Sequence, residues 1–220
     1  LYWGAKEFVD NGKDGSEKWI ILLSDGHQNE PSTFDDQFGF LLGTGIRVET
    51  IALGTGADKN HLQSIADKTF GKYYEVEAAE GSPRGGGAAS GNMILDLANT
   101  FLLSSERIHR RDRILEKAGS IGPGDTIAYE LDLAEGGLSD CIASVYANST
   151  SADLDFTIIT PAGTPVPLPD EGYTATNLDP SGNYWDPSYY TTYRLGSMGD
   201  GHWTLSIVNN GAGAESYLLV

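Results

Sequence analysis

The chain has 220 residues and a formal net charge of −17, with 31 acidic side chains against 14 basic ones. Because a chain this acidic repels the phosphates of nucleic acids and of anionic membrane surfaces, we expect neither as a partner. No apolar run approaches the roughly 20 residues that span a bilayer. The single cysteine, Cys141, excludes an internal disulfide and a multi-cysteine zinc site.

The first 109 residues alternate between helical and strand patterns. The opening LYWGAKEFVDNG has the pattern of a helix interior, so we expect the natural polypeptide to begin further upstream. Strands are predicted at 19–23, 48–53 and 72–76, and helices at 34–42, 59–69 and 92–109. Strands that alternate with helices and are apolar on both faces predict a parallel sheet in a three-layer α/β structure.

The second part of the chain, residues 110–220, has a different pattern. Short, partly alternating runs at 126–133, 141–147, 154–160, 202–209 and 216–220 are separated by Gly, Pro, Asn and Asp clusters. This pattern predicts an antiparallel β-sandwich as a second domain. Residues 1–110 hold 10 basic and 16 acidic side chains and residues 111–220 hold 4 and 15, so the second part carries −11 of the net charge.

Two segments lie near the predicted boundary. The glycine-rich stretch at 80–91 predicts a surface loop. The basic run RIHRRDR, residues 107–113, is interpreted as a solvated helix end, where cations suit the helix dipole.

Asp25 is the first candidate for chemistry. The run KWIILLSDGHQNE, residues 18–30, is an apolar strand that ends in Ser-Asp-Gly. Ligands of open α/β sheets bind beyond the carboxyl ends of the strands, so a carboxylate beside Gly26 is well placed to face a metal ion. The alternative is that Asp25 is an ordinary turn residue. Gly26, His27 and Asn29 are predicted to shape the rim of a ligand site.

An ordered set of short motifs resembles the second half of a von Willebrand factor A domain, over residues 1–109. These motifs are Asp25-Gly26, Gly54-Thr55-Gly56, the LxxIA helix from Leu62 to Ala66, and Tyr73-Tyr74. The resemblance implies that Asp25 belongs to a metal-ion-dependent adhesion site for Mg²⁺ or Ca²⁺. The family's Asp-x-Ser-x-Ser loop and additional Thr are absent here, and one carboxylate cannot supply the octahedral oxygen shell of Mg²⁺. We therefore expect the missing half of the domain, or another copy, to complete the site.

The second part of the chain resembles secreted β-sandwiches, including the pre-peptidase C-terminal type and the sandwich that follows the A domain in the calcium-activated chloride channel regulator family. The segments involved are 151–166 and 201–220, the latter resembling a closing hairpin. Asp153 and Asp155 alternate along a predicted strand, so both carboxylates lie on one face and could share a Ca²⁺ ion. The alternative is that one caps a turn and the other is solvated.

The sequence favours a binding protein over an enzyme. It contains no His-Glu-x-x-His or Gly-x-Ser-x-Gly motif, and Gly54-Thr-Gly fits neither the dinucleotide nor the P-loop spacing. We expect an extracellular or cell-surface adhesion module for a protein or glycan ligand. The alternatives are a non-catalytic C-terminal region of a larger secreted metalloprotease-like protein, as the second resemblance implies, and a structural surface or filament protein. The aromatic stretch 183–193 either binds a ligand or fills the sandwich core.

Overall fold

The computed structural model describes residues 1–13, 15–26, 34–77, 93–148, 152–166, 177–178, 184–185 and 190–220. The chain divides into two compact units, Leu1–Ser82 with Asp96–Asp112 and Pro83–Leu95 with Arg113–Val220. Among the described residues, no helix combines the length and the apolar character that crossing a bilayer requires.

The first unit is an α/β structure with a parallel sheet of order β1-β2-β3. The helix between consecutive strands carries the chain back, which is what parallel pairing requires. The predicted strands and helices agree with the observed ones to within a few residues. The elements are α1 (Tyr2–Asn11), β1 (Trp19–Ser24), α2 (Phe34–Gly43), β2 (Arg47–Leu53), α3 (Lys59–Lys68), β3 (Tyr73–Val76) and α4 (Met93–His109).

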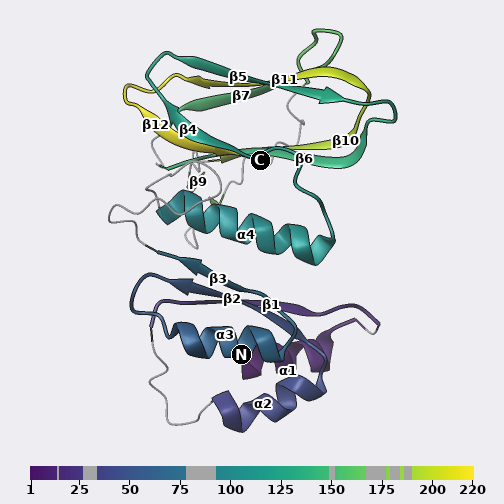
Figure 1. Cartoon of the computed structure of the whole chain (residues 1–220), viewed down its shortest axis with the longest axis vertical. Coiled ribbons are helices and arrows are strands. Elements are labelled where there is room, and N and C mark those ends of the chain that lie inside the picture. Colours follow the sequence, from purple (N-terminus) through teal and green to yellow (C-terminus); the bar gives the residue numbers. More distant parts are fainter. Residues whose placement is uncertain are drawn as a thin grey trace. The chain divides into compact units, whose positions relative to one another are not determined.

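Helices cover both faces of this sheet (Figure 1). On one face, Val48 of β2 and Ile20 of β1 pack in a cluster with side chains of α1, α2 and α3. On the other face, Ile51 and Tyr74 pack with Leu97 of α4. The central strand β2 is therefore apolar toward both helical layers, as the continuous run in the sequence predicts.

The second unit is antiparallel and all-β. One sheet has the order β10-β6-β12-β4, another has the order β5-β11-β7, and β8 pairs with β9. The described strands are β4 (Lys117–Ile121), β5 (Thr126–Leu133), β6 (Leu138–Ala147), β7 (Leu154–Ile159), β8 (Asn177–Leu178), β9 (Tyr184–Trp185), β10 (Tyr190–Met198), β11 (Gly201–Asn209) and β12 (Glu215–Leu219).

The two larger sheets share one apolar core. Ile158 and Ile207 from one sheet and Val145 and Leu219 from the other are at most 2% exposed and belong to one cluster. Tyr193, from the predicted aromatic stretch, is buried there too, and its hydroxyl donates to the Phe156 carbonyl at 2.8 Å. The other side chains of 183–193 lie outside what the structure describes.

The prediction that residues 201–220 form a closing hairpin is wrong. Strand β11 pairs with β5 and β7, whereas β12 pairs with β4 and β6, so the two strands belong to different sheets. The fully buried Asn209 explains the crossing. Its amide nitrogen donates to the carbonyls of Ile121 at 3.0 Å and Gly213 at 2.7 Å, and its oxygen accepts from the Gly211 amide at 2.9 Å. These bonds tie the connection to β4 in the opposite sheet.

Candidate functional site

Asp25 lies where the sequence places it, directly after β1 at the carboxyl end of the parallel sheet, and its side chain is exposed. The Gly26 carbonyl accepts from the Ser24 hydroxyl at 3.2 Å and from the Asp58 amide at 3.4 Å, which ties this loop to the start of α3. A Cβ on Gly56 would stand 2.9 Å from the Asp25 carbonyl oxygen. The glycine after β2 therefore allows the two loops to approach closely.

Other carboxylates at this end of the sheet have structural partners. Asp58 caps α3 by accepting from the His61 amide at 3.1 Å. Lys59 pairs with Glu75 and, at 2.8 Å, with Glu77 beyond the end of β3. The hydrogen bonds to Glu75 and then Glu77 raise the pKa of Lys59, so this cation holds both acids.

No metal centre is assembled within the part of the chain that the structure describes, since no three His, Cys, Asp or Glu side chains there are grouped to hold an ion. Asp25 and Gly26 follow the end of β1, and the predicted role of Gly26 in a ligand rim stays a prediction. His27 and Asn29 lie outside the described residues. The metal role of Asp25 stays a prediction, and a single exposed carboxylate requires further ligands to bind Mg²⁺ or Ca²⁺ firmly.

Asp153 and Asp155 lie at the start of β7, and both are exposed. Asn210 contacts both residues. Its backbone amide donates to the Asp153 carbonyl at 2.8 Å, and its side-chain amide donates to Asp155 Oδ2 at 2.7 Å. One carboxylate is thus engaged by a neutral donor, and the predicted Ca²⁺ site of this pair also stays a prediction.

The outer edge of β1 is open among the described strands, because β1 pairs with β2 alone. The Arg47 amide donates to the Lys18 carbonyl at 3.0 Å. In a parallel ladder alternate residues face the same neighbour, so the backbone groups of Trp19, Ile21 and Leu23 point toward the open edge. The side chains of Ile21 and Leu23 are 37% and 40% exposed.

The two edges of the sheet differ in protection. Strand β3 is only four residues long and carries Glu75, with Lys72 just before it and Glu77 just after it. Short length and charge are the usual means of keeping an edge strand from pairing. Strand β1, with the sequence WIILLS, has no charged residue. The apolar edge of β1 is therefore the one fitted to accept another strand.

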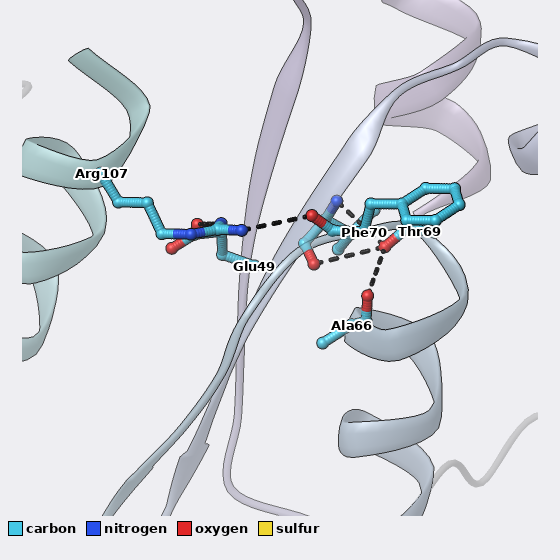
Figure 2. Close-up of polar contacts among 6 residues, drawn as sticks. Glu49, Ala66, Thr69, Phe70 and Arg107 are labelled. Atoms are coloured by element: carbon cyan, nitrogen blue, oxygen red, sulfur yellow. Dashed lines mark hydrogen bonds and ion pairs between the residues drawn. The ribbon is translucent and has the colours of Figure 1, made fainter. Parts of the chain in front are cut away.

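A buried ion pair joins α4 to the sheet (Figure 2). Glu49 of β2 has a fully buried side chain and pairs with Arg107, whose side chain is 37% exposed. Arg107 Nη2 also donates to the Phe70 carbonyl at 3.3 Å. The basic run 107–113 is therefore not a uniformly solvated helix end, since Arg107 neutralises a buried carboxylate. The signal in the sequence was the glutamate inside the apolar run VETIAL.

Aromatic and polar groups surround this pair. The guanidinium carbons of Arg47 and Arg107 lie 5.0 and 5.3 Å from the centroid of the Trp19 ring. Burial and the negative charge of Glu49 raise the pKa of the Tyr74 hydroxyl. Of the five buried polar side-chain atoms that lack a hydrogen-bond partner among the described residues, four are Trp19 Nε1, Glu49 Oε2, Tyr74 Oη and Ser104 Oγ. The layer between α4 and the sheet is thus polar at this point, which favours a structural role for the ion pair.

The comparisons with known proteins identify no family. No family model and no curated protein matches the chain. Among solved structures, a von Willebrand factor type A protein from Catenulispora acidiphila is similar over 98% of this chain and 40% of its own length, at 13% identity and a TM-score of 0.34. The Bacillus licheniformis lipase BlEst2 in propeptide form is similar over 98% and 56%, at 12% identity and a TM-score of 0.34.

A third similar structure is an uncharacterized membrane spanning protein from Vibrio fischeri, over 44% of this chain and 50% of that one, at 17% identity and a TM-score of 0.31. The chain therefore spans about half the length of the solved chains it matches. TM-scores this low carry no weight for fold or function. The strand order itself defines an α/β unit with a parallel sheet, followed by an all-β unit of antiparallel sheets.

Proposed function

We propose that the protein is an extracellular or cell-surface adhesion module that binds a protein or glycan through a divalent cation, Mg²⁺ or Ca²⁺, at the carboxyl end of its parallel sheet. Asp25 supplies one oxygen ligand. The resemblance of its motifs to the second half of a von Willebrand factor A domain motivates this assignment. The remaining ligands come from a further polypeptide segment that pairs along β1.

The observation that carries the proposal is the position of Asp25 at the end of an unprotected edge strand. An added strand would satisfy the outward backbone groups of Trp19, Ile21 and Leu23 and cover two exposed apolar side chains. The loop at the end of that strand would then lie beside Asp25. Oxygen ligands from two neighbouring strand ends are the arrangement that a hard divalent cation requires.

The test is native mass spectrometry of the purified protein with Mg²⁺ or Ca²⁺, before and after chelation. We expect to detect the chain in a non-covalent complex with a second polypeptide, either a fragment or another copy. The complex should retain one divalent ion that the chelator removes. Asp25→Ala should abolish retention of the ion without dissociating the two polypeptides. Asp67→Ala is the matched control, because Asp67 is an exposed aspartate in the last turn of α3.

Two results would refute the proposal. One is a metal-free monomer, detected with no second polypeptide at physiological concentrations of both cations. The other is an assembly in which Asp25→Ala retains the ion as fully as Asp67→Ala does.

A further inference from the structure

The connection between β11 and β12, residues 210–214, begins with a chemically labile pair, Asn210-Gly211. Asparagine is one of the thermolabile residue types of proteins. It is most labile before glycine, because the backbone nitrogen of a residue without a side chain most readily approaches the asparagine amide carbon. The sequence contains one other such pair, Asn11-Gly12, at the end of α1.

The reaction of such a pair in water is deamidation. The Gly211 nitrogen loses its proton to hydroxide and attacks Cγ of Asn210, so that a new N–Cγ bond forms. The Cγ–Nδ2 bond breaks, and ammonia leaves with a proton taken from water. Water then opens the resulting cyclic imide at either carbonyl, which leaves aspartate or isoaspartate at position 210. One water is consumed and one ammonia is released, and no other reactant is required.

The fold itself favours glycine at position 211. A Cβ there would stand 3.0 Å from Oδ1 of Asn209, closer than ordinary van der Waals contact. Asn209 is fully buried, and its amide nitrogen ties the connection to the carbonyls of Ile121 and Gly213. The labile pair is therefore a consequence of the same bonds that hold the connection in place.

Both reacting groups are engaged in the folded chain. The attacking atom, the Gly211 nitrogen, donates to Asn209 Oδ1 at 2.9 Å. The leaving group, Asn210 Nδ2, donates to Asp155 Oδ2 at 2.7 Å, and the Asn210 backbone amide donates to the Asp153 carbonyl at 2.8 Å. The attack requires the Asn210 side chain to turn away from Asp155 and the Gly211 amide to leave Asn209.

Exclusion of water does not protect the pair, because Asn210 is exposed. If access to water alone set the rate, Asn210 would react as fast in the folded chain as in an unfolded peptide. The bonds to Asn209 and Asp155 are what distinguish the two states. The rate in the folded chain is therefore set by how often the connection opens.

We propose that Asn210 is a modification site, which deamidates to aspartate or isoaspartate when the connection opens and which Asn209 and Asp155 hold unreacted while it is closed. The reaction replaces the nitrogen that donates to Asp155 Oδ2 at 2.7 Å with an oxygen. Two carboxylates at this separation repel each other, so the modified connection is less stable in its closed form. The site is independent of Asp25 and of the adhesion function proposed above.

The test compares rates of deamidation at mildly alkaline pH, measured by mass spectrometry of proteolytic fragments. The reference for an unprotected pair is the synthetic peptide SIVNNGAGA, residues 206–214. We expect Asn210 to react at least about tenfold more slowly in the folded chain than in this peptide, because reaction waits for local opening. A chelator in every sample removes any contribution from the Ca²⁺ predicted at Asp153 and Asp155.

Two variants test the role of Asp155. Asp155→Ala frees Asn210 Nδ2 and should speed deamidation in the folded chain several-fold. Asp153→Ala is the matched control, because it removes a neighbouring exposed carboxylate but keeps the backbone carbonyl that accepts from the Asn210 amide, so the rate should not change. Asn11-Gly12 is an internal reference in the same samples, since neither variant should alter its rate.

The variant Asn210→Asp reproduces the aspartate product. It should lower the melting temperature of the second unit further than Asn210→Ala does, because alanine only loses the bond to Asp155 whereas aspartate adds a repulsion. When Asp155→Ala is also present, the difference between the two variants should disappear.

Three results would overturn the inference. The first is deamidation of Asn210 in the folded chain at the rate of the peptide. The second is a rate that Asp155→Ala leaves unchanged, or that Asp153→Ala raises as much. The third is an Asn210→Asp variant that melts no lower than Asn210→Ala, which would show that the product is tolerated beside Asp155.

Discussion

Replacing Arg107 by glutamine tests whether α4 is held to the sheet by the buried ion pair. The change leaves the carboxylate of Glu49, whose side chain is fully buried, without its cation, and it removes a donor from the Phe70 carbonyl. Removing one partner of a buried pair costs about 3–5 kcal/mol. Because the Arg107 side chain is 37% exposed, water can approach the site, and we expect a loss at the lower end, about 3 kcal/mol.

The assay must report on the first unit alone, because a chain of two units need not unfold in one step. Hydrogen exchange of the amides in β2 and α4 gives the free energy of opening of that unit, and the amides of β11 serve as an internal reference. Arg110→Gln is the matched control. Its side chain is 79% exposed and pairs at 2.9 Å with Glu17, which is 49% exposed, so we expect a loss below about 1 kcal/mol.

The single variant Glu49→Gln and the double variant Glu49→Gln with Arg107→Gln complete a double-mutant cycle. The double variant is the informative one. It removes both charges, so we expect it to be more stable than Arg107→Gln alone, with a coupling energy above about 1 kcal/mol. A single-variant loss no larger than that of Arg110→Gln, or a coupling below about 0.5 kcal/mol, would refute the reasoning.

Two further predictions concern the second, all-β unit. Hydrogen bonding to Asp132, at 2.6 Å, and the nearby charge of Glu130, at 2.8 Å, raise the pKa of His202 above its ordinary 6.5. The stabilisation that protonated His202 gains from these carboxylates is therefore complete below pH 6.5 and is lost as the pH rises through the raised pKa. His202→Gln should lower the melting temperature at pH 5.5 and not at pH 9. A difference in melting temperature that does not depend on pH would contradict this prediction. Asn209→Leu should destabilise the second unit by about 3 kcal/mol in urea titrations, since three backbone groups lose a buried partner. Asn210→Ala, which removes one exposed bond to Asp155, should cost under about 1 kcal/mol, and equal losses would rule out the assigned role of Asn209.

Local pattern was enough to predict most elements of the first unit. The strands are continuous apolar runs, and the helices between them have apolar residues at helical spacing, so both signals are contained within a few residues. Strand β4 was not predicted because its sequence, KAGSI, has neither alternation nor β-branched residues before Ile121. It becomes a strand through pairing with β12, which lies about a hundred residues further along the chain.

The sites that were not predicted also depend on residues far apart in the sequence. Asp25 was found because Asp and Gly are adjacent at a strand end. The pairing of Glu49 with Arg107 joins residues 58 positions apart, and nothing in the run 107–113 distinguishes Arg107 from its neighbours. The supposed closing hairpin looked local because two strands flank a glycine-rich turn. The long-range pairings put β11 and β12 in different sheets, and the buried amide of Asn209, bonded to Ile121 in β4, holds the turn between them.

The position of β12 bears on how the protein is synthesised. It lies inside the four-stranded sheet, between β6 and β4, although it is the last of the strands that the structure describes. A nascent chain halted before Glu215 would hold β4 and β6 with no partner between them. Among the described strands, that sheet can therefore be completed only once β12, Glu215–Leu219, is available for pairing. The described strands of the parallel sheet, in contrast, all end by Val76, so the strands of the two units become available for pairing at widely separated points of translation.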